Sequence, residues 1–162
     1  MKKRTAVYPG SFDPVTYGHL DIIRRGLEVF DELVIAVARN SEKKGLFSIF
    51  ERIELLERLI DDKRVRIETF DGLLVNFVLS HGSRVILRGL RAVSDFEYEF
   101  MLAQTNRAMH DEVETMFMMT SVPYVYLSST VVKEIATLGG PVDKFVPPAV
   151  QDALKKKLSQ NS

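Results

Sequence analysis

The sequence predicts an α/β fold with a doubly wound, parallel, five-stranded sheet, in one domain over residues 1–162. Short apolar, β-branched runs alternate with helical patterns along the chain, an order typical of parallel βαβ units with right-handed crossovers. The length of 162 residues fits one domain. No internal repeat, low-complexity tract or interdomain linker divides it.

Five apolar runs rich in β-branched residues predict the strands, in chain order at 5–8, 33–38, 65–70, 85–87 and 114–118. Helical patterns between and after these runs predict the helices, at 17–30, 49–60, 73–80, 95–109, 129–138 and 148–158. Every strand is therefore followed by a helix, as a parallel sheet requires.

Local signals mark several helix ends. Thr16 is a good N-cap for the first helix, and Ser94 with Glu97 forms a capping-box pattern at the start of the fourth. One of the hydroxyls at 128–130 must cap the fifth helix. The lysines near the end of the sixth suit a helix C-terminus.

Composition excludes several classes of function. Lys plus Arg equal Asp plus Glu at 22 each, so no global basic field recruits nucleic acid or a membrane surface, and any anion site must be local. The absence of cysteine excludes disulfides, thiolate nucleophiles and cysteine-rich zinc sites, and suits a cytoplasmic location, which we expect. The first apolar run is too short for a signal peptide, and no stretch is long enough to cross a membrane.

The most informative stretch is YPGSFDPVTYGHLD, from Tyr8 to Asp21. It runs from a strand through a Gly/Pro turn into a helix whose first turn holds Gly18 and His19. Unpaired amides and the helix dipole at such an end attract anions, so this junction predicts a phosphate site. For Gly18 alone a structural role is the simpler interpretation, but its combination with Ser11, Thr16 and His19 favours function.

In parallel sheets, ligands bind beyond the carboxyl ends of the strands, and cationic side chains gather in the turns there. Lys43 and Lys44 follow the second strand; taken alone they are solvated lysines, but Lys binds phosphate as a mobile point charge. Arg88 and Arg91 follow the fourth strand, where they either bind phosphate or form salt bridges to acidic residues of the next helix.

Hydroxyls and aromatic rings follow the fifth strand. Because one of Ser128, Ser129 and Thr130 serves as N-cap, the other hydroxyls remain for a second anion site. Tyr124 and Tyr126 either flank a base or alternate as ordinary packing residues. Met116, Met118 and Met119 pack in the core or in a contact between subunits.

Several motifs are missing. The chain has no GxGxxG after the first strand, no GxxxxGK[ST] and no GxSxG, which disfavours dehydrogenase-type dinucleotide binding, a P-loop and a hydrolase elbow. His81 and His110 lack partners at ligand spacing, so we assign no protein-bound metal. The predicted site holds phosphates without an evident nucleophile or strong base.

At these residues the chain resembles the small nucleotidyltransferases with an H/T-x-G-H signature, and within them the bacterial phosphopantetheine adenylyltransferases. YPGSFDPVTYGH carries Thr16, Gly18 and His19 at the ordered positions of the signature, and RGLRAVSDFEYE and YLSST narrow the resemblance. It covers nearly the whole chain and implies a Rossmann-like nucleotidyltransferase fold. It also implies transfer of AMP from ATP to 4'-phosphopantetheine, giving dephospho-coenzyme A and pyrophosphate.

The resemblance also implies residue roles. His19 contacts the α-phosphate and stabilises the transition state, and Ser11 lies between the two substrates. Positions that match the phosphopantetheine site are Ser11, Lys43, Leu74 and Arg88. Positions that match the ATP site are Ser11, Phe12, His19, Gly89, Leu90, Arg91, Glu99, Tyr124, Val125, Tyr126, Leu127, Ser128, Ser129 and Thr130. The family further implies Mg²⁺ carried with ATP, a homohexamer, and inhibition by coenzyme A.

Two other functions are compatible with the same residues. One is a transferase on this scaffold with a different acceptor, such as nicotinamide mononucleotide. The other is a nucleotide sensor that binds without catalysis, although His19 together with two basic loops disfavours it. A panel of phosphate acceptors distinguishes them.

Overall fold

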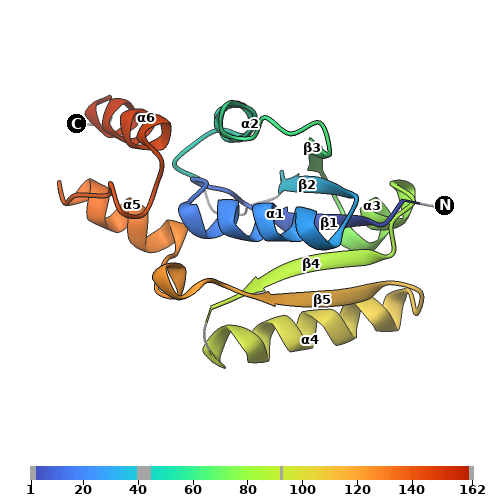
Figure 1. Ribbon diagram of the computed structural model, residues 1–162. Helices are drawn as coiled ribbons and strands as arrows, with labels where there is room; N and C mark the ends of the chain where they lie inside the picture. Colours follow the sequence, from blue (N-terminus) through green and yellow to red (C-terminus); the bar gives the residue numbers. More distant parts are fainter. Residues whose placement is uncertain (1–2, 40–44, 92, 161–162) are drawn as a thin grey trace.

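The fold is a parallel sheet flanked by helices, seen in a computed structural model that describes residues 3–39, 45–91 and 93–160. Five parallel strands pair in the order β3-β2-β1-β4-β5 (Figure 1). Their bounds are β1 (Thr5–Gly10), β2 (Glu32–Ala38), β3 (Val65–Phe70), β4 (Val85–Leu90) and β5 (Glu114–Met119). The predicted doubly wound, parallel, five-stranded sheet is confirmed.

The predicted helices are also present, with shifted ends. They are α1 (Tyr17–Val29), α2 (Ile49–Leu59), α3 (Leu74–Ser80), α4 (Val93–Met109), α5 (Ser129–Thr137) and α6 (Pro148–Ser159), with a short 3₁₀ helix η1 (Val122–Tyr124). Because α4 begins at Val93, Ser94 lies inside the helix, and the predicted N-cap at Ser94 is wrong. None of the described helices is long and apolar enough to cross a membrane.

Strand alternation builds a hydrophobic core on each face of the sheet. In β2, Leu33, Ile35 and Val37 belong to the cluster packed by α1, α2, α5 and α6, whereas Val34 and Ala36 belong to the cluster packed by α3. All five of these side chains are fully buried, so β2 is apolar on both faces because helices cover both.

Four strands are longer than the sequence predicts: β2 and β5 by one residue each, and β1 and β4 by two and three residues at their carboxyl ends. Pro9 and Gly10 continue β1 in register with β2, and Gly89 and Leu90 continue β4 in register with β5. Gly89 also allows α1 to approach, since a Cβ there would lie 3.1 Å from Ile22 Cγ1. The strand order reverses between β1 and β4, which is where ligands bind in doubly wound sheets.

Candidate functional site

A cleft of about 520 Å³ opens at the carboxyl ends of β1 and β4. In Figure 1 the start of α1 lies at this end of the sheet, with α5 and α6 beyond it. Ten of the predicted site residues line the cleft, namely Ser11, His19, Arg88, Gly89, Arg91, Glu99, Leu127, Ser128, Ser129 and Thr130. The cleft therefore gathers residues that follow β1, β4 and β5, which are three of the four predicted places. The fourth, the turn with Lys43 and Lys44, lies outside the described residues.

Thr16 and His19 form a reciprocal capping box at the start of α1. The Thr16 hydroxyl accepts from the His19 backbone N–H at 3.4 Å, and the Thr16 backbone N–H donates to His19 Nδ1 at 3.0 Å. A backbone N–H only donates, so Nδ1 is the acceptor and the proton of the neutral ring resides on Nε2. The cap therefore fixes both the orientation and the tautomer of the imidazole.

The imidazole of His19 stays neutral at physiological pH. Burial, with smaller contributions from the positive charges of Arg91 and Arg88, lowers its pKa to about 4. The ring packs against Phe12, with ring centroids 4.9 Å apart. A neutral imidazole on a fixed cap donates through Nε2 and places no charge in the cleft before substrate binds.

The guanidinium of Arg88 donates three hydrogen bonds within the protein. Its Nε donates to Glu99 Oε2 at 2.8 Å, its Nη2 donates to Glu99 Oε1, and its Nη1 donates to the carbonyl of Pro9 at 2.9 Å. These bonds use three of the five N–H groups of a guanidinium. The ion pair weighed as an alternative at the sequence level is thus present, and the remaining N–H groups can still meet an anion.

Arg91 is held in a similar way. It pairs with Asp95, with Nε 2.8 Å from Oδ2, and its Nη1 donates to the Leu127 carbonyl at 2.9 Å. Arg91 therefore ties the end of β4 to the chain that leads into α5. Asp95 also lines the cleft, together with Tyr98 and Thr120, and the sequence reasoning assigned none of these three to the site.

The start of α5 supplies fewer donors than three adjacent hydroxyls suggest. Ser128 is the N-cap and accepts from the Val131 N–H at 3.1 Å. The Ser129 hydroxyl donates to the Pro14 carbonyl at 2.7 Å, which joins α5 to the β1–α1 turn. Thr130 lines the cleft beside them.

Some predicted residues lie outside the lining of the cleft. Phe12 is buried in the core, with 1% of its surface exposed, at a backbone φ of 49°. Tyr124 stacks on Tyr17, with ring centroids 6.2 Å apart. Tyr126 has 90% of its surface exposed. Leu90 and Val125 also lie outside the lining, as does Leu74. Lys43 lies outside the described residues.

A second, more apolar pocket of about 240 Å³ adjoins the cleft. It contains the predicted Leu74, and it shares Ser11, Arg88 and Glu99 with the cleft. Leu102 and Asn106 of α4 also line it, although the sequence reasoning missed them. Their spacing from Glu99 puts them on one face of a helix, which is a signal that could have found them.

Two carboxylates of the cleft are paired with arginines. Glu99 pairs with Arg88, and Asp95 pairs with Arg91. Within the described ranges no group of three or more His, Asp or Glu residues is arranged to hold a metal ion.

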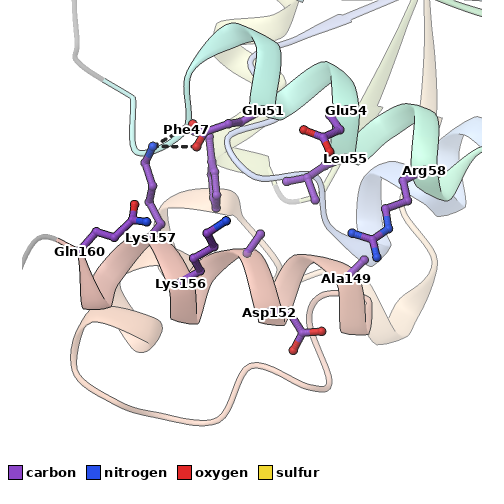
Figure 2. Close-up of a pocket in the computed structure, with 11 residues that line it drawn as sticks. Phe47, Glu51, Glu54, Leu55, Arg58, Ala149, Asp152, Lys156, Lys157 and Gln160 are labelled. Atoms are coloured by element: carbon purple, nitrogen blue, oxygen red, sulfur yellow. Dashed lines mark hydrogen bonds and ion pairs between the residues drawn. The ribbon is translucent and has the colours of Figure 1, made fainter.

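Another groove of about 260 Å³ lies between α2 and α6 (Figure 2). Its floor includes Phe47 and Leu55, and its rim carries charges of both signs, including a bridge in which Lys157 Nζ lies 2.8 Å from Glu51 Oε1. It contains none of the predicted site residues. The cleft at the end of β1 and β4 is therefore the better candidate for chemistry.

Comparison with known proteins identifies a family and close relatives of the chain. The cytidylyltransferase-like family matches residues 7–135, which include the capping box and the start of α5. The chain is 62% identical over 161 residues to a phosphopantetheine adenylyltransferase of Geobacter metallireducens, with 99% of each chain covered. It is 58% identical over 160 residues to the protein of that name from Geobacter sulfurreducens, with 98% of each covered.

Solved structures share the fold at much lower identity. A putative nicotinate-nucleotide adenylyltransferase from Vibrio parahaemolyticus superposes with a TM-score of 0.71 at 17% identity, covering 99% of this chain and 98% of that one. A Plasmodium falciparum nicotinic acid mononucleotide adenylyltransferase complexed with NaAD gives 0.68 at 15% identity, covering 96% of each chain. These likenesses establish the Rossmann-like sheet architecture of the chain.

Proposed function

The chain belongs to the phosphopantetheine adenylyltransferase family of cytidylyltransferase-like proteins, and we propose that it transfers AMP from ATP to 4'-phosphopantetheine. The products are dephospho-coenzyme A and pyrophosphate. The observation that carries the proposal is the pair of adjoining cavities, a polar cleft for a nucleotide and a more apolar pocket for the arm of the acceptor. Arg88 and Ser11 line both, where the two substrates would meet.

The proposed residue roles follow this division. His19 acts on the α-phosphate, and Ser11 stands between the substrates. Leu74 and Arg88, with Lys43, bind 4'-phosphopantetheine. The nucleotide binds Ser11, Phe12, His19, Gly89, Leu90, Arg91, Glu99 and the segment 124–130. For Phe12 and Leu90, whose side chains are buried, we propose contact through the backbone.

The proposed chemistry is a direct in-line displacement. An oxygen of the acceptor phosphate attacks the α-phosphorus of ATP, and the bond from that phosphorus to the bridging oxygen breaks as pyrophosphate leaves. With a second pKa near 6, a phosphate monoester is about 90% dianionic at pH 7, so no general base is needed. The protein contributes positioning and donors that strengthen as charge builds up.

His19 is suited to this task because of its cap. With Nδ1 accepting from Thr16, Nε2–H is the ring donor available to a phosphate oxygen. Arg88 and Arg91 reduce the repulsion between the two anionic substrates. Each guanidinium is held in place by a carboxylate, Glu99 for Arg88 and Asp95 for Arg91. Mg²⁺ enters with ATP as part of the substrate, bound by phosphate oxygens and water.

We also propose a homohexamer, inhibition by coenzyme A and a cytoplasmic location. Support for assembly comes from α4 and β5, which expose large apolar side chains at Phe96, Tyr98, Phe100, Met101, Met116 and Met119. Exposed apolar side chains on two neighbouring elements are typical of an interaction site. Coenzyme A contains the pantetheine arm of the product, so the same two cavities would accept it.

The direct test is to incubate purified protein with ATP, Mg²⁺ and 4'-phosphopantetheine and to detect dephospho-coenzyme A by mass spectrometry. Nicotinic acid mononucleotide and nicotinamide mononucleotide serve as competing acceptors in parallel reactions. Product from 4'-phosphopantetheine alone supports the proposal. Product from another acceptor in its place, or no pyrophosphate with any of them, overturns it.

A further inference from the structure

Asp13 is a buried carboxylate with an unusually complete set of donors, and it lines neither cavity. Only 4% of its surface is exposed. Its Oδ1 accepts from the Phe47 N–H at 2.9 Å, and its Oδ2 accepts from the Leu46 N–H at 3.0 Å and from Lys133 Nζ at 2.8 Å. Arg52 adds a second positive charge, with Nε 3.6 Å from Oδ1.

These donors come from separate elements. Leu46 and Phe47 lead into α2, Arg52 belongs to α2, and Lys133 belongs to α5. Asp13 itself lies in the β1–α1 turn, three residues before the Thr16 cap that orients His19. One carboxylate therefore joins the turn to the entry of α2 and to α5.

Neighbouring bonds reinforce the same junction. Arg52 Nη1 donates to the Ser11 carbonyl at 3.2 Å, and Arg52 Nε donates to the Phe47 carbonyl at 2.9 Å. Gly45 leaves the space for Arg52, because a Cβ there would lie 1.9 Å from Nη2. The Ser129 hydroxyl gives α5 a second bond to the turn, at the Pro14 carbonyl.

The charges at this junction favour the ionised carboxylate. Burial opposes ionisation, but the bonds from Lys133, Phe47 and Leu46 and the charge of Arg52 outweigh it, so the pKa of Asp13 is lowered. Removing the Asp13 carboxylate would leave Lys133 half-buried and Arg52 buried without a counter-charge, and removing Lys133 would leave Asp13 with Arg52 as its one remaining cationic partner among these residues. The junction therefore acts as a unit.

We propose that Asp13 is a positioning residue whose carboxylate fixes the spacing between the His19 turn and the start of α5, the two walls of the nucleotide cleft. This proposal rests on the function proposed above, because the distance between the two walls of the cleft matters for in-line attack at the α-phosphorus. Displacements on the order of 1 Å remote from the reacting atoms can lower turnover by about a hundredfold. Loss of the junction should therefore lower kcat more than it weakens ATP binding.

The test compares Lys133→Met, Lys133→Arg and Asp13→Asn with a matched control, Lys157→Met. Lys157 makes a bridge of the same 2.8 Å length to Glu51 and is similarly exposed, at 26% against 30% for Lys133, but it joins α6 to α2. At saturating substrates, and well below each melting temperature, we expect kcat of Lys133→Met to fall about tenfold or more. Lys133→Arg should recover most of it, and Lys157→Met should match the parent.

Asp13→Asn distinguishes a positioning role of the junction from direct attraction of ATP by Lys133. It keeps the Lys133 ammonium, so turnover would persist if that charge simply attracted ATP. We expect instead the same loss of kcat as in Lys133→Met, with no further loss in the double variant, because both changes break one junction. Parent-like kcat in Lys133→Met, or losses in the two single variants that multiply in the double variant, would overturn the proposal.

Hydrogen exchange at backbone amides provides a second test. It needs no acceptor substrate, and it does not require that Asp13→Asn folds. In Lys133→Met, but not in Lys157→Met, we expect faster exchange at the amides of Leu46, Phe47 and Val131. Unchanged exchange at all three would refute the proposed junction. If the parent protein makes no dephospho-coenzyme A while exchange changes as expected, the proposed reaction fails, and the junction by which Asp13 fixes the spacing of the two walls stands.

Discussion

At the scale of single residues, the properties of His19 follow from its neighbours in the capping box. The Thr16 backbone N–H occupies Nδ1, so the proton stays on Nε2, and burial keeps the ring neutral. A neutral donor avoids a strong ground-state attraction to ATP that would have to be overcome later. Its bond can strengthen as negative charge develops on the α-phosphate.

His19→Ala should therefore lose turnover and keep the fold. By analogy with removal of one preorganised donor, we expect kcat to fall by roughly 10² to 10³ while ATP affinity changes much less. Steady-state kinetics and calorimetric titration with ATP measure the two quantities. A kcat within a few-fold of the parent would mean that the imidazole is incidental.

The same residue predicts a pH dependence of stability. In the folded protein the pKa of His19 is about 4, against 6.5 in the reference state, so between these values the unfolded chain binds more protons. The free energy of unfolding should therefore rise with pH from about 4 to 6.5, and this contribution is lost as pH falls through that window. Urea unfolding of the parent and of His19→Gln across this range measures it. Equal slopes for the two proteins would contradict a half-buried ring that is neutral in the folded protein.

Arg88 predicts a change in acceptor binding. Arg88→Lys keeps the charge but loses the planar fork that contacts Glu99 and the Pro9 carbonyl at once. We expect affinity for 4'-phosphopantetheine to fall about tenfold, a loss of one good charge-assisted contact, measured by calorimetric titration. Arg107→Lys, in the exposed pair with Glu114, is the control. Equal affinity in both variants would remove Arg88 from the acceptor site.

At the scale of secondary-structure elements, α1 approaches the sheet closely enough to place His19 above the end of β1. Gly26 allows this approach, since a Cβ there would lie 3.0 Å from Leu33 Cδ1 and 3.0 Å from Leu87 Cδ2. Both leucines are buried and have little room to move.

Gly26→Ala therefore sets two effects against each other. Alanine stabilises a helix interior by about 1 kcal/mol relative to glycine, but overpacking of a buried contact costs about 1–3 kcal/mol. We expect a net loss of about 1 kcal/mol, measured by chemical denaturation. A more stable variant would show that α1 can move away from the sheet.

The presence of each helix and strand was predictable from the sequence because it depends on local patterns. The residues at which they begin and end were less predictable. The Thr16 cap and the alternation of strands and helices are written within a few residues of sequence. Pro9 and Gly10 instead read as a strand end, yet pairing with β2 carries β1 through them. The extension of β4 to Leu90 likewise depends on β5, which lies far along the chain.

The site shows the same division. The residues that line the cleft follow the strand ends, so their convergence was predictable from topology. The carboxylate partners of the two arginines, Glu99 and Asp95, were foreseen as alternatives because they lie in the helix that directly follows the arginines. The carbonyl partners, Pro9 and Leu127, were not foreseen. Asp13 was not foreseen, since its partners Phe47 and Lys133 are 34 and 120 residues away in sequence.

At the scale of the whole molecule, the cleft lies where the strand order reverses, between β1 and β4. The exposed apolar side chains of α4 and β5 predict that copies of the chain associate through these elements. The assignment of residues 1–162 to one domain stays a prediction. Helix α4 contributes to both features: Asp95 and Glu99 line the cleft, whereas Phe96 and Phe100 on the same helix are exposed apolar side chains.

We therefore expect the protein to form a homo-oligomer through α4 and β5. Phe100→Asp, on an apolar side chain that is 49% exposed, should shift the mass toward the monomer in sedimentation or light-scattering measurements. Val29→Asp, on an apolar side chain of α1 that is 41% exposed, is the control and should leave the mass unchanged. A monomeric parent, or a hexamer unaffected by Phe100→Asp, would contradict this surface assignment.

The most direct test of the whole account is a crystal structure with a non-hydrolysable ATP analogue and Mg²⁺. We predict the triphosphate in the cleft at the ends of β1 and β4, with His19 Nε2 about 2.7–3.2 Å from an oxygen of the α-phosphate. The Thr16 N–H should still donate to Nδ1 in that complex. A ring turned away from the phosphates, or a nucleotide bound instead between α2 and α6, would contradict it.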